Sequence, residues 1–297
     1  YRLDEIEYDF DQNTIVDATR TFSYDATGHV TMSTYLHPGD FTPDLFNSED
    51  EDLQEETTVV TFDGNDLADT FEVTRIEDGL GTIEIDSALT FAGGDLTRVD
   101  GDRTFFGQTF SFFANFLYAG GRIDQISGGL IGFWTFTHDG DVVPDTATVL
   151  AGDLTVDTAF TFRPDGKIDL LVSTATEDGL VVGGGSGDYV YDANGRLTDE
   201  IWTFTGAPSS SPYAEFQNTA YRKSYAYAAD GLKLSEAIDV GDDGSVEATR
   251  TFSWEPGPCV DAFNWAPNGP PNFVLDPTKP YVPGTGAFDL QVCPEPG

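Results

Sequence analysis

The stretch DFDQNTIVDATRTFSYDATG, residues 9–28, is repeated near the other end of the chain as DVGDDGSVEATRTFSWEPG, residues 239–257. The two copies align without a gap through the run Thr-Arg-Thr-Phe-Ser, after which Tyr24 falls on Trp254. Self-similarity of this kind indicates a chain built from a repeated supersecondary unit. Each copy joins an acidic segment to an alternating strand and a glycine turn.

The end of this unit, a strand with two large apolar residues two positions apart that runs into a glycine turn, recurs along the chain. Because successive strand residues face opposite sides, a period of two describes a sheet with one buried face. We predict an all-β protein, an antiparallel hairpin meander whose apolar face curls into a barrel-like roll or a sandwich. The eight occurrences are Phe22/Tyr24 with Gly28, Val60/Phe62 with Gly64, Leu89/Phe91 with Gly94, Phe116/Tyr118 with Gly121, Phe160/Phe162 with Gly166, Tyr189/Tyr191 with Gly195, Tyr225/Tyr227 with Gly231, and Phe252/Trp254 with Gly257.

Three local patterns add to this prediction. Residues 103–136 carry apolar residues on both faces, so we expect these strands to be covered on both sides and to lie centrally in the sheet. The run GGGSG, residues 183–187, predicts a flexible loop tip. His29 lies in a hairpin turn, where we expect it to be exposed.

The C-terminal part differs in composition from the rest. We predict a repeated β-hairpin domain over residues 1–254 and an irregular tail rich in Pro and Gly over residues 255–297. Both cysteines, Cys259 and Cys293, fall in this tail, which predicts a disulfide and an oxidising compartment. The alternative is two free buried thiols in a cytosolic protein.

The chain has 297 residues and a formal net charge of −38. Such a field repels nucleic acid and anionic membranes and attracts cations. No run of 18 apolar residues is present, so we expect no transmembrane helix. No signal peptide is visible, and we expect a mature or trimmed form of a secreted or surface protein, with a lipid anchor upstream as one way of attachment.

The acidic half of the repeated unit is the strongest candidate site. Its oxygen-bearing side chains stand at positions 1, 3, 5 and 9, a spacing that can bring ligands together on calcium. Position 12, where a calcium loop carries a bidentate Glu, holds Arg20 and Arg250 instead, so any affinity should be weak. The alternative interpretation is an acidic hairpin turn without metal. The candidate ligands are Asp9, Asp11, Asn13 and Asp17 in the first copy, and Asp239, Asp243 and Glu247 in the second.

The runs FSYDATGHVT, residues 22–31, and YVYDANGRLT, residues 189–198, resemble the YD repeats of Rhs-type bacterial surface and secreted proteins. The acidic run before the first of them resembles the calcium-type loops that accompany such repeats in some bacterial surface lipoproteins. The resemblance implies a bacterial extracellular protein of stacked β-hairpins, in which the repeats are scaffold and not catalytic machinery.

We therefore predict a non-enzymatic structural or interaction protein, secreted or at the cell surface, stabilised by calcium. Such a protein could assemble with itself through strand edges or another surface. One alternative is an extracellular polysaccharide hydrolase with paired carboxylates. Others are a carbohydrate- or small-ligand-binding module and an outer-membrane barrel of 16 strands.

Overall fold

In the computed structural model, the described residues are 1–10, 12–37, 53–65, 67–77, 81–93, 95–119, 122–128, 132–138, 145–151, 153–205, 220–259, 264–265, 281–282 and 293. They form strands and connecting turns, and none of them is in a long apolar helix of the kind that spans a bilayer. The strands are β1 (Arg2–Asp9), β2 (Ala18–Tyr24), β3 (Val30–Leu36), β4 (Leu53–Phe62), β5 (Ala68–Glu77), β6 (Gly81–Ala92), β7 (Asp95–Phe105), β8 (Gln108–Ala119), β9 (Arg122–Gly128), β10 (Gly132–Thr137), β11 (Thr146–Ala151), β12 (Leu154–Phe162), β13 (Ile168–Glu177), β14 (Leu180–Tyr191), β15 (Leu197–Thr205), β16 (Ala220–Tyr227), β17 (Lys233–Val240), β18 (Ala248–Glu255), β19 (Asn264–Trp265) and β20 (Tyr281–Val282).

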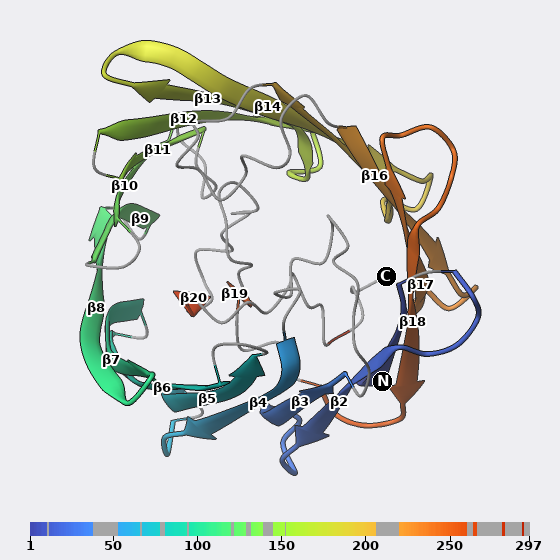
Figure 1. The fold of residues 1–297 in the computed structure, drawn as a ribbon, viewed down its shortest axis with the longest axis horizontal. Coiled ribbons are helices and arrows are strands. Elements are labelled where there is room, and N and C mark those ends of the chain that lie inside the picture. Colours follow the sequence, from blue (N-terminus) through green and yellow to red (C-terminus); the bar gives the residue numbers. More distant parts are fainter. Residues whose placement is uncertain are drawn as a thin grey trace.

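Strands β1 to β18 form one antiparallel sheet that closes into a barrel (Figure 1). Each strand pairs with its neighbours in sequence, and the ring closes where β1 pairs with β18 from Arg2↔Glu255 to Asp9↔Thr249. The predicted all-β antiparallel meander is thus confirmed, and of the two predicted forms, a barrel-like roll or a sandwich, it takes the barrel. Because closure removes sheet edges, assembly through free edges of this sheet, one of the two routes considered above, does not apply.

The repeated glycine turns all lie at one end of the barrel, here called the glycine end. Seven of the eight occurrences are hairpins of the barrel, and a register shift falls immediately before the second of the two large apolar residues in each. The eighth ends β18, whose next neighbour in the ring is β1. The hairpin of β10 and β11 lacks the pattern, which is why the sequence indicated 16 strands and the barrel has 18.

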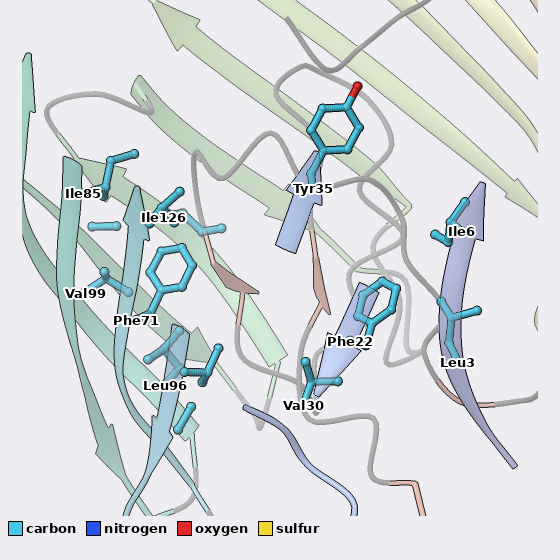
Figure 2. Close-up of a cluster of buried hydrophobic side chains, with 14 of the residues drawn as sticks. Leu3, Ile6, Phe22, Val30, Tyr35, Phe71, Ile85, Leu96, Val99 and Ile126 are labelled. Atoms are coloured by element: carbon cyan, nitrogen blue, oxygen red, sulfur yellow. The ribbon is translucent and has the colours of Figure 1, made fainter. Parts of the chain in front are cut away.

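The inner face carries the hydrophobic core. Phe22, Val30, Tyr35 and Phe71 all point to the same interior (Figure 2) and are at most 8% exposed. Eight strands already make a barrel that side chains can fill, so a ring of 18 leaves room for more chain inside. The short strands β19 and β20 pair in parallel and lie inside the ring in Figure 1.

The expectation that the strands within residues 103–136 are covered on both faces is wrong. Phe113, Leu117 and Phe133 face outward and are 41%, 52% and 36% exposed, so the strands around them are covered on one face only. This follows from closure, because every strand of a single-layer barrel has an outer face. The outer face is otherwise rich in Thr, Ser and carboxylate side chains, as in the outward row Glu72, Asp86 and Asp102.

The run GGGSG is not a loop tip but the middle of β14. A Cβ on Gly187 would lie 3.0 Å from the indole of Trp202, which is 1% exposed. Trp202 stacks on Phe204 and Tyr221 with ring centroids 6.2 and 6.1 Å apart. The absent side chain therefore makes room for an aromatic stack on the neighbouring strand, a tertiary reason that local composition does not reveal.

The disulfide between Cys259 and Cys293 is present, with the two Cα atoms 5.6 Å apart. Cys293 packs against the barrel core. At the other cysteine, a Cβ on Gly28 would lie 2.6 Å from the carbonyl of Pro258 and 2.8 Å from the nitrogen of Cys259. The disulfide thus stands against the turn between β2 and β3, at the glycine end.

Candidate functional site

The two copies of the acidic segment form neighbouring loops at the other end of the barrel, here called the loop end. One connects β1 to β2 and the other connects β17 to β18. They are neighbours because β1 pairs with β18 at the seam, where Asp9 stands opposite Thr249. Figure 1 shows the blue N-terminal strand beside the orange strands that precede the tail. Closure therefore brings together two segments about 230 positions apart.

Both loops share one hydrogen-bond pattern. In the first, Asp9 accepts from Thr14 N at 2.9 Å, Asp17 accepts from Phe10 N at 2.7 Å, and Asn13 accepts from Ile15 N at 2.7 Å. The second loop repeats these bonds position for position. Asp239 accepts from Gly244 N at 2.8 Å, Glu247 from Val240 N at 2.7 Å, and Asp243 from Ser245 N at 2.9 Å.

The predicted ligands therefore first of all cap the backbone of their own loops, as Asp and Asn commonly do in turns. Oδ1 of Asp9 is buried and accepts no hydrogen bond, so it keeps lone pairs for another partner. Asp11 lies outside the described residues. Within the ranges described above, no three His, Cys, Asp or Glu side chains converge as a metal-binding group.

The residue at position 12 of each copy, Arg20 or Arg250, forms a buried ion pair, a role that the comparison with calcium loops did not predict. Arg20 points into the barrel and donates to Glu56 at 3.1 Å, and Arg75 lies 2.9 Å from the other oxygen of that carboxylate. Arg250 likewise donates to Glu236 at 3.1 Å. The signal was present in the sequence, because Arg20 shares its strand face with the buried Ala18 and Phe22.

These ion pairs belong to a polar and aromatic band on the inner wall. The guanidinium of Arg250 lies 5.3 Å from the ring centre of Tyr8, and Tyr8 meets Tyr35 edge to face at 5.6 Å. Burial would raise the pKa of Glu236, but the charges of Arg250, Lys223 and Lys233 hold it below its ordinary value. Glu236 is therefore a buried carboxylate kept in its charged form.

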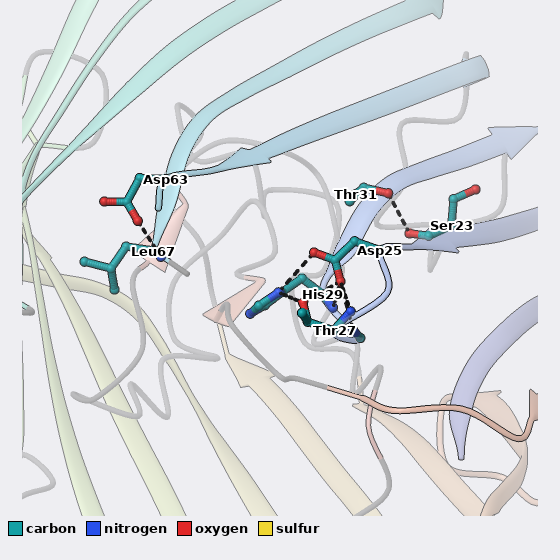
Figure 3. Close-up of polar contacts among 8 residues, drawn as sticks. Ser23, Asp25, Thr27, His29, Thr31, Asp63 and Leu67 are labelled. Atoms are coloured by element: carbon teal, nitrogen blue, oxygen red, sulfur yellow. Dashed lines mark hydrogen bonds and ion pairs between the residues drawn. The ribbon is translucent and has the colours of Figure 1, made fainter. Parts of the chain in front are cut away.

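A second polar group lies in the turn between β2 and β3 (Figure 3). His29 is 4% exposed, so the expectation of an exposed histidine is wrong; its ring stacks on Phe62 at 4.4 Å. Asp25 and Thr27 both approach the same ring nitrogen, Nδ1, at 3.2 and 2.7 Å. A nucleophile and an orienting carboxylate would need opposite nitrogens of the ring, so this arrangement braces the turn.

The turn carboxylates are held in their charged forms. At Asp25 burial opposes this, yet hydrogen bonds from Thr27 and from the N–H groups of His29 and Gly28 bring the pKa below its ordinary value. The N–H of Arg196, followed by the Arg196 side chain and the N–H of Asn194, lowers the pKa of Asp192 to about 2. Asp63 is shifted in the same direction, first by the N–H of Leu67. Asp63 thus caps the turn between β4 and β5.

No family model matches this sequence, and no curated protein matches it. Among solved structures, TcdB2-TccC3 without its hypervariable C-terminal region is similar, with a TM-score of 0.41 and 11% identity over 82% of this chain. The match covers 14% of that chain, so the present chain spans a small part of its length. Porin-like proteins from Bacteroides vulgatus and Bacteroides uniformis give TM-scores of 0.40 and 0.39 at 12% identity, covering 86% and 85% of this chain and 98% of each of theirs.

Proposed function

We propose that this chain is a non-enzymatic structural or interaction protein of the bacterial cell surface or exterior, and that its two acidic loops bind calcium weakly. The observation that carries the proposal is that these two loops are neighbours at the seam of the barrel, where β1 pairs with β18. Sequence resemblance to YD-repeat proteins supports the bacterial extracellular assignment, and the disulfide supports an oxidising compartment.

The seam is a pairing without a direct chain connection between its two strands. It joins the first strand of the barrel to the last, so its opening would turn the closed ring into a sheet with two free edges. The two loops place Asp9, Asp17, Asp239 and Glu247 close to this junction. Their like charges repel each other, and a divalent cation bound between or within the loops would relieve that repulsion.

Calcium should therefore stabilise the barrel. We expect the unfolding temperature of the oxidised chain to rise with calcium in roughly the 0.1–10 mM range and to fall back when a chelator is added, because a ligand that binds only the folded state stabilises it. Replacing Asp9 and Asp239 together by Asn should remove most of this rise. At Asp9 Asn keeps the single oxygen that caps the loop, whereas at Asp239 both oxygens accept, from Asp243 N at 3.1 Å and Gly244 N at 2.8 Å, so the variant should unfold at a somewhat lower temperature without calcium. The calcium effect is therefore the rise of each variant above its own value without calcium.

The matched control is the double variant Asp169→Asn with Asp188→Asn, two exposed carboxylates on β13 and β14. It changes the net charge equally but away from the seam. If calcium leaves the unfolding temperature unchanged, or if the control loses as much of the calcium effect as the loop variant, the calcium part of the proposal is wrong. Light scattering in the same titration tests self-assembly, for which we expect particle growth that a chelator reverses.

A further inference from the structure

The four most exposed large apolar side chains of the described residues all lie at the loop end. Val181 is 72% exposed, Leu180 71%, Ile15 65% and Phe106 63%. They stand at the connections β1–β2, β7–β8 and β13–β14. The described turns of the glycine end present Thr27, Asn65 and Asn194 instead. We call Ile15, Val16, Phe106, Leu180 and Val181 the apolar tips.

The apolar tips are evenly spaced around the barrel. In the closed order of 18 strands, the connections β1–β2, β7–β8 and β13–β14 are each six strands apart. They therefore divide the circumference into thirds. The less exposed side chains Leu36, Leu150 and Val246, at 48%, 43% and 40%, stand at or beside other connections of the same end. The exposed apolar groups therefore follow the rim of the loop end, whereas a groove for a peptide or a helix would bring them together along one line.

The tip of β7–β8 has an unusual backbone. Phe106 and Gly107 have φ angles of +50° and +70°, a left-handed pair like Asp178 and Gly179 at the tip of β13–β14, with +50° and +76°. Asp-Gly is a preferred sequence for such turns, whereas a bulky residue rarely adopts a positive φ. Phe106 thus combines an unfavourable backbone with a largely exposed aromatic ring, and such outliers point to a function outside the fold.

We propose that the loop end docks on the surface of a phospholipid bilayer with zwitterionic headgroups, with the apolar tips inserted among those headgroups. A bilayer interface accepts separate aliphatic and aromatic protrusions without shaped pockets. The outward carboxylates Glu72, Asp86 and Asp102 lie side by side on the barrel wall, which favours contact through the end.

The carboxylates beside the apolar tips favour a zwitterionic headgroup over an anionic one. Asp17 follows Val16, and Asp178 lies two residues before Leu180, so carboxylates border the apolar tips. They repel an anionic bilayer, whose surface potential attracts basic proteins. A zwitterionic headgroup presents an ammonium group outermost, which carboxylates and an aromatic ring such as that of Phe106 can both contact favourably.

Sedimentation with phosphatidylcholine vesicles in the presence of a chelator tests this proposal without involving calcium. We expect the full oxidised chain to bind, and Leu180→Ser with Val181→Ser to lower the partition coefficient about tenfold or more, because two large apolar side chains are lost. The matched control is Val190→Ser with Leu234→Ser, exposed positions on β14 and β17 near the glycine end. It should bind as the unaltered chain does.

A second variant separates docking from folding. Phe106→Asn suits the left-handed turn better, so it should keep or raise the unfolding temperature while it weakens vesicle binding. No binding by the unaltered chain, equal losses in the control pair, or tighter binding to phosphatidylglycerol vesicles would each overturn the proposal. A dimer formed without vesicles and abolished by Leu180→Ser with Val181→Ser would overturn it in favour of self-association. A failure of the calcium titration leaves these outcomes unaffected.

Discussion

Arg20 and Glu56 form a buried ion pair on the inner wall, with Nη1 and Oε1 3.1 Å apart and both side chains 1% exposed. Arg75 completes the group from the next strand, so one carboxylate serves two guanidinium groups. Arg250 of the second copy forms a comparable buried pair with Glu236 of β17. The group of Arg20, Glu56 and Arg75 thus ties β2, β4 and β5 together through charges that are at most 4% exposed.

Removal of the central carboxylate should be among the most damaging single substitutions in the barrel. Glu56→Leu leaves Arg20 and Arg75 buried with one less compensating charge, and we expect a loss of about 3–5 kcal/mol in the free energy of unfolding. Urea unfolding measures it. The surface pair Arg98–Asp100, with side chains 41% and 51% exposed, is the control, and Arg98→Ala should cost at most about 1 kcal/mol. Equal effects would contradict a structural role for the buried group.

Gly187, in the glycine run of β14, should not tolerate a side chain, because the indole of Trp202 packs against it. Gly187→Ala places a methyl group 3.0 Å from the indole and should cost about 1–3 kcal/mol through overpacking. Near-ultraviolet circular dichroism should change with it, since the aromatic stack must shift. Ser186→Ala, one residue away on the same strand, is the control and should leave both the spectrum and the stability close to those of the unaltered chain.

Alanine substitutions at Gly28 and Gly195 compare the turn beside the disulfide with an equivalent turn of the repeat elsewhere in the barrel. Gly28 and Gly195 occupy equivalent turns with φ angles of +102° and +80°, so alanine is strained at both, by about 1–2 kcal/mol. At Gly28 a Cβ also meets the Pro258 carbonyl at 2.6 Å, whereas at Gly195 the nearest atom is the flexible Nζ of Lys167 at 3.7 Å. Gly28→Ala should therefore lower the unfolding temperature clearly more than Gly195→Ala. Similar effects would show that Pro258 does not press on this turn.

Reduction of the disulfide should destabilise the chain without abolishing the barrel strands. Cys259 and Cys293 are 34 positions apart, and in the entropic description a loop of this size contributes about 3–4 kcal/mol. We expect a lower unfolding temperature under reducing conditions and the same value in the variant Cys259→Ser with Cys293→Ser. The double variant should no longer respond to reductant, which checks that the effect comes from this bond.

The decrease of the unfolding temperature at acidic pH should depend on the turn carboxylates. The pKa of Asp192 falls from 3.8 to about 2 on folding, so its contribution is fully present above about pH 4 and is lost as the pH drops towards 2. Asp192→Asn removes this contribution, so it should flatten the dependence of the unfolding temperature on pH in that window and lower the unfolding temperature at neutral pH. Asp169→Asn, on an exposed strand position, should keep the slope of the unaltered chain.

The sequence by itself determined the local structure of this protein. The period of two gave the strands, the glycine positions gave seven of the hairpins, and the two tail cysteines gave the disulfide, because each of these depends on a few neighbouring residues. It also identified the acidic loops by their internal repeat. Their hydrogen bonds are local too, which is why both copies form the same turn.

Only the tertiary structure decided the rest, because it depends on which strands meet. Closure at the seam places Asp9 beside Thr249, brings the two acidic loops together and removes the sheet edges. Inward orientation makes Arg20 and Arg250 ion-pair donors where a calcium loop has a ligand. Trp202 packs against Gly187, which accounts for a glycine in the middle of a strand. His29 is buried although it lies in a turn, because its ring packs on Phe62. The even placement of the apolar tips likewise exists only in the closed ring, since the third interval of six strands, from β13 onward to β1, crosses the seam.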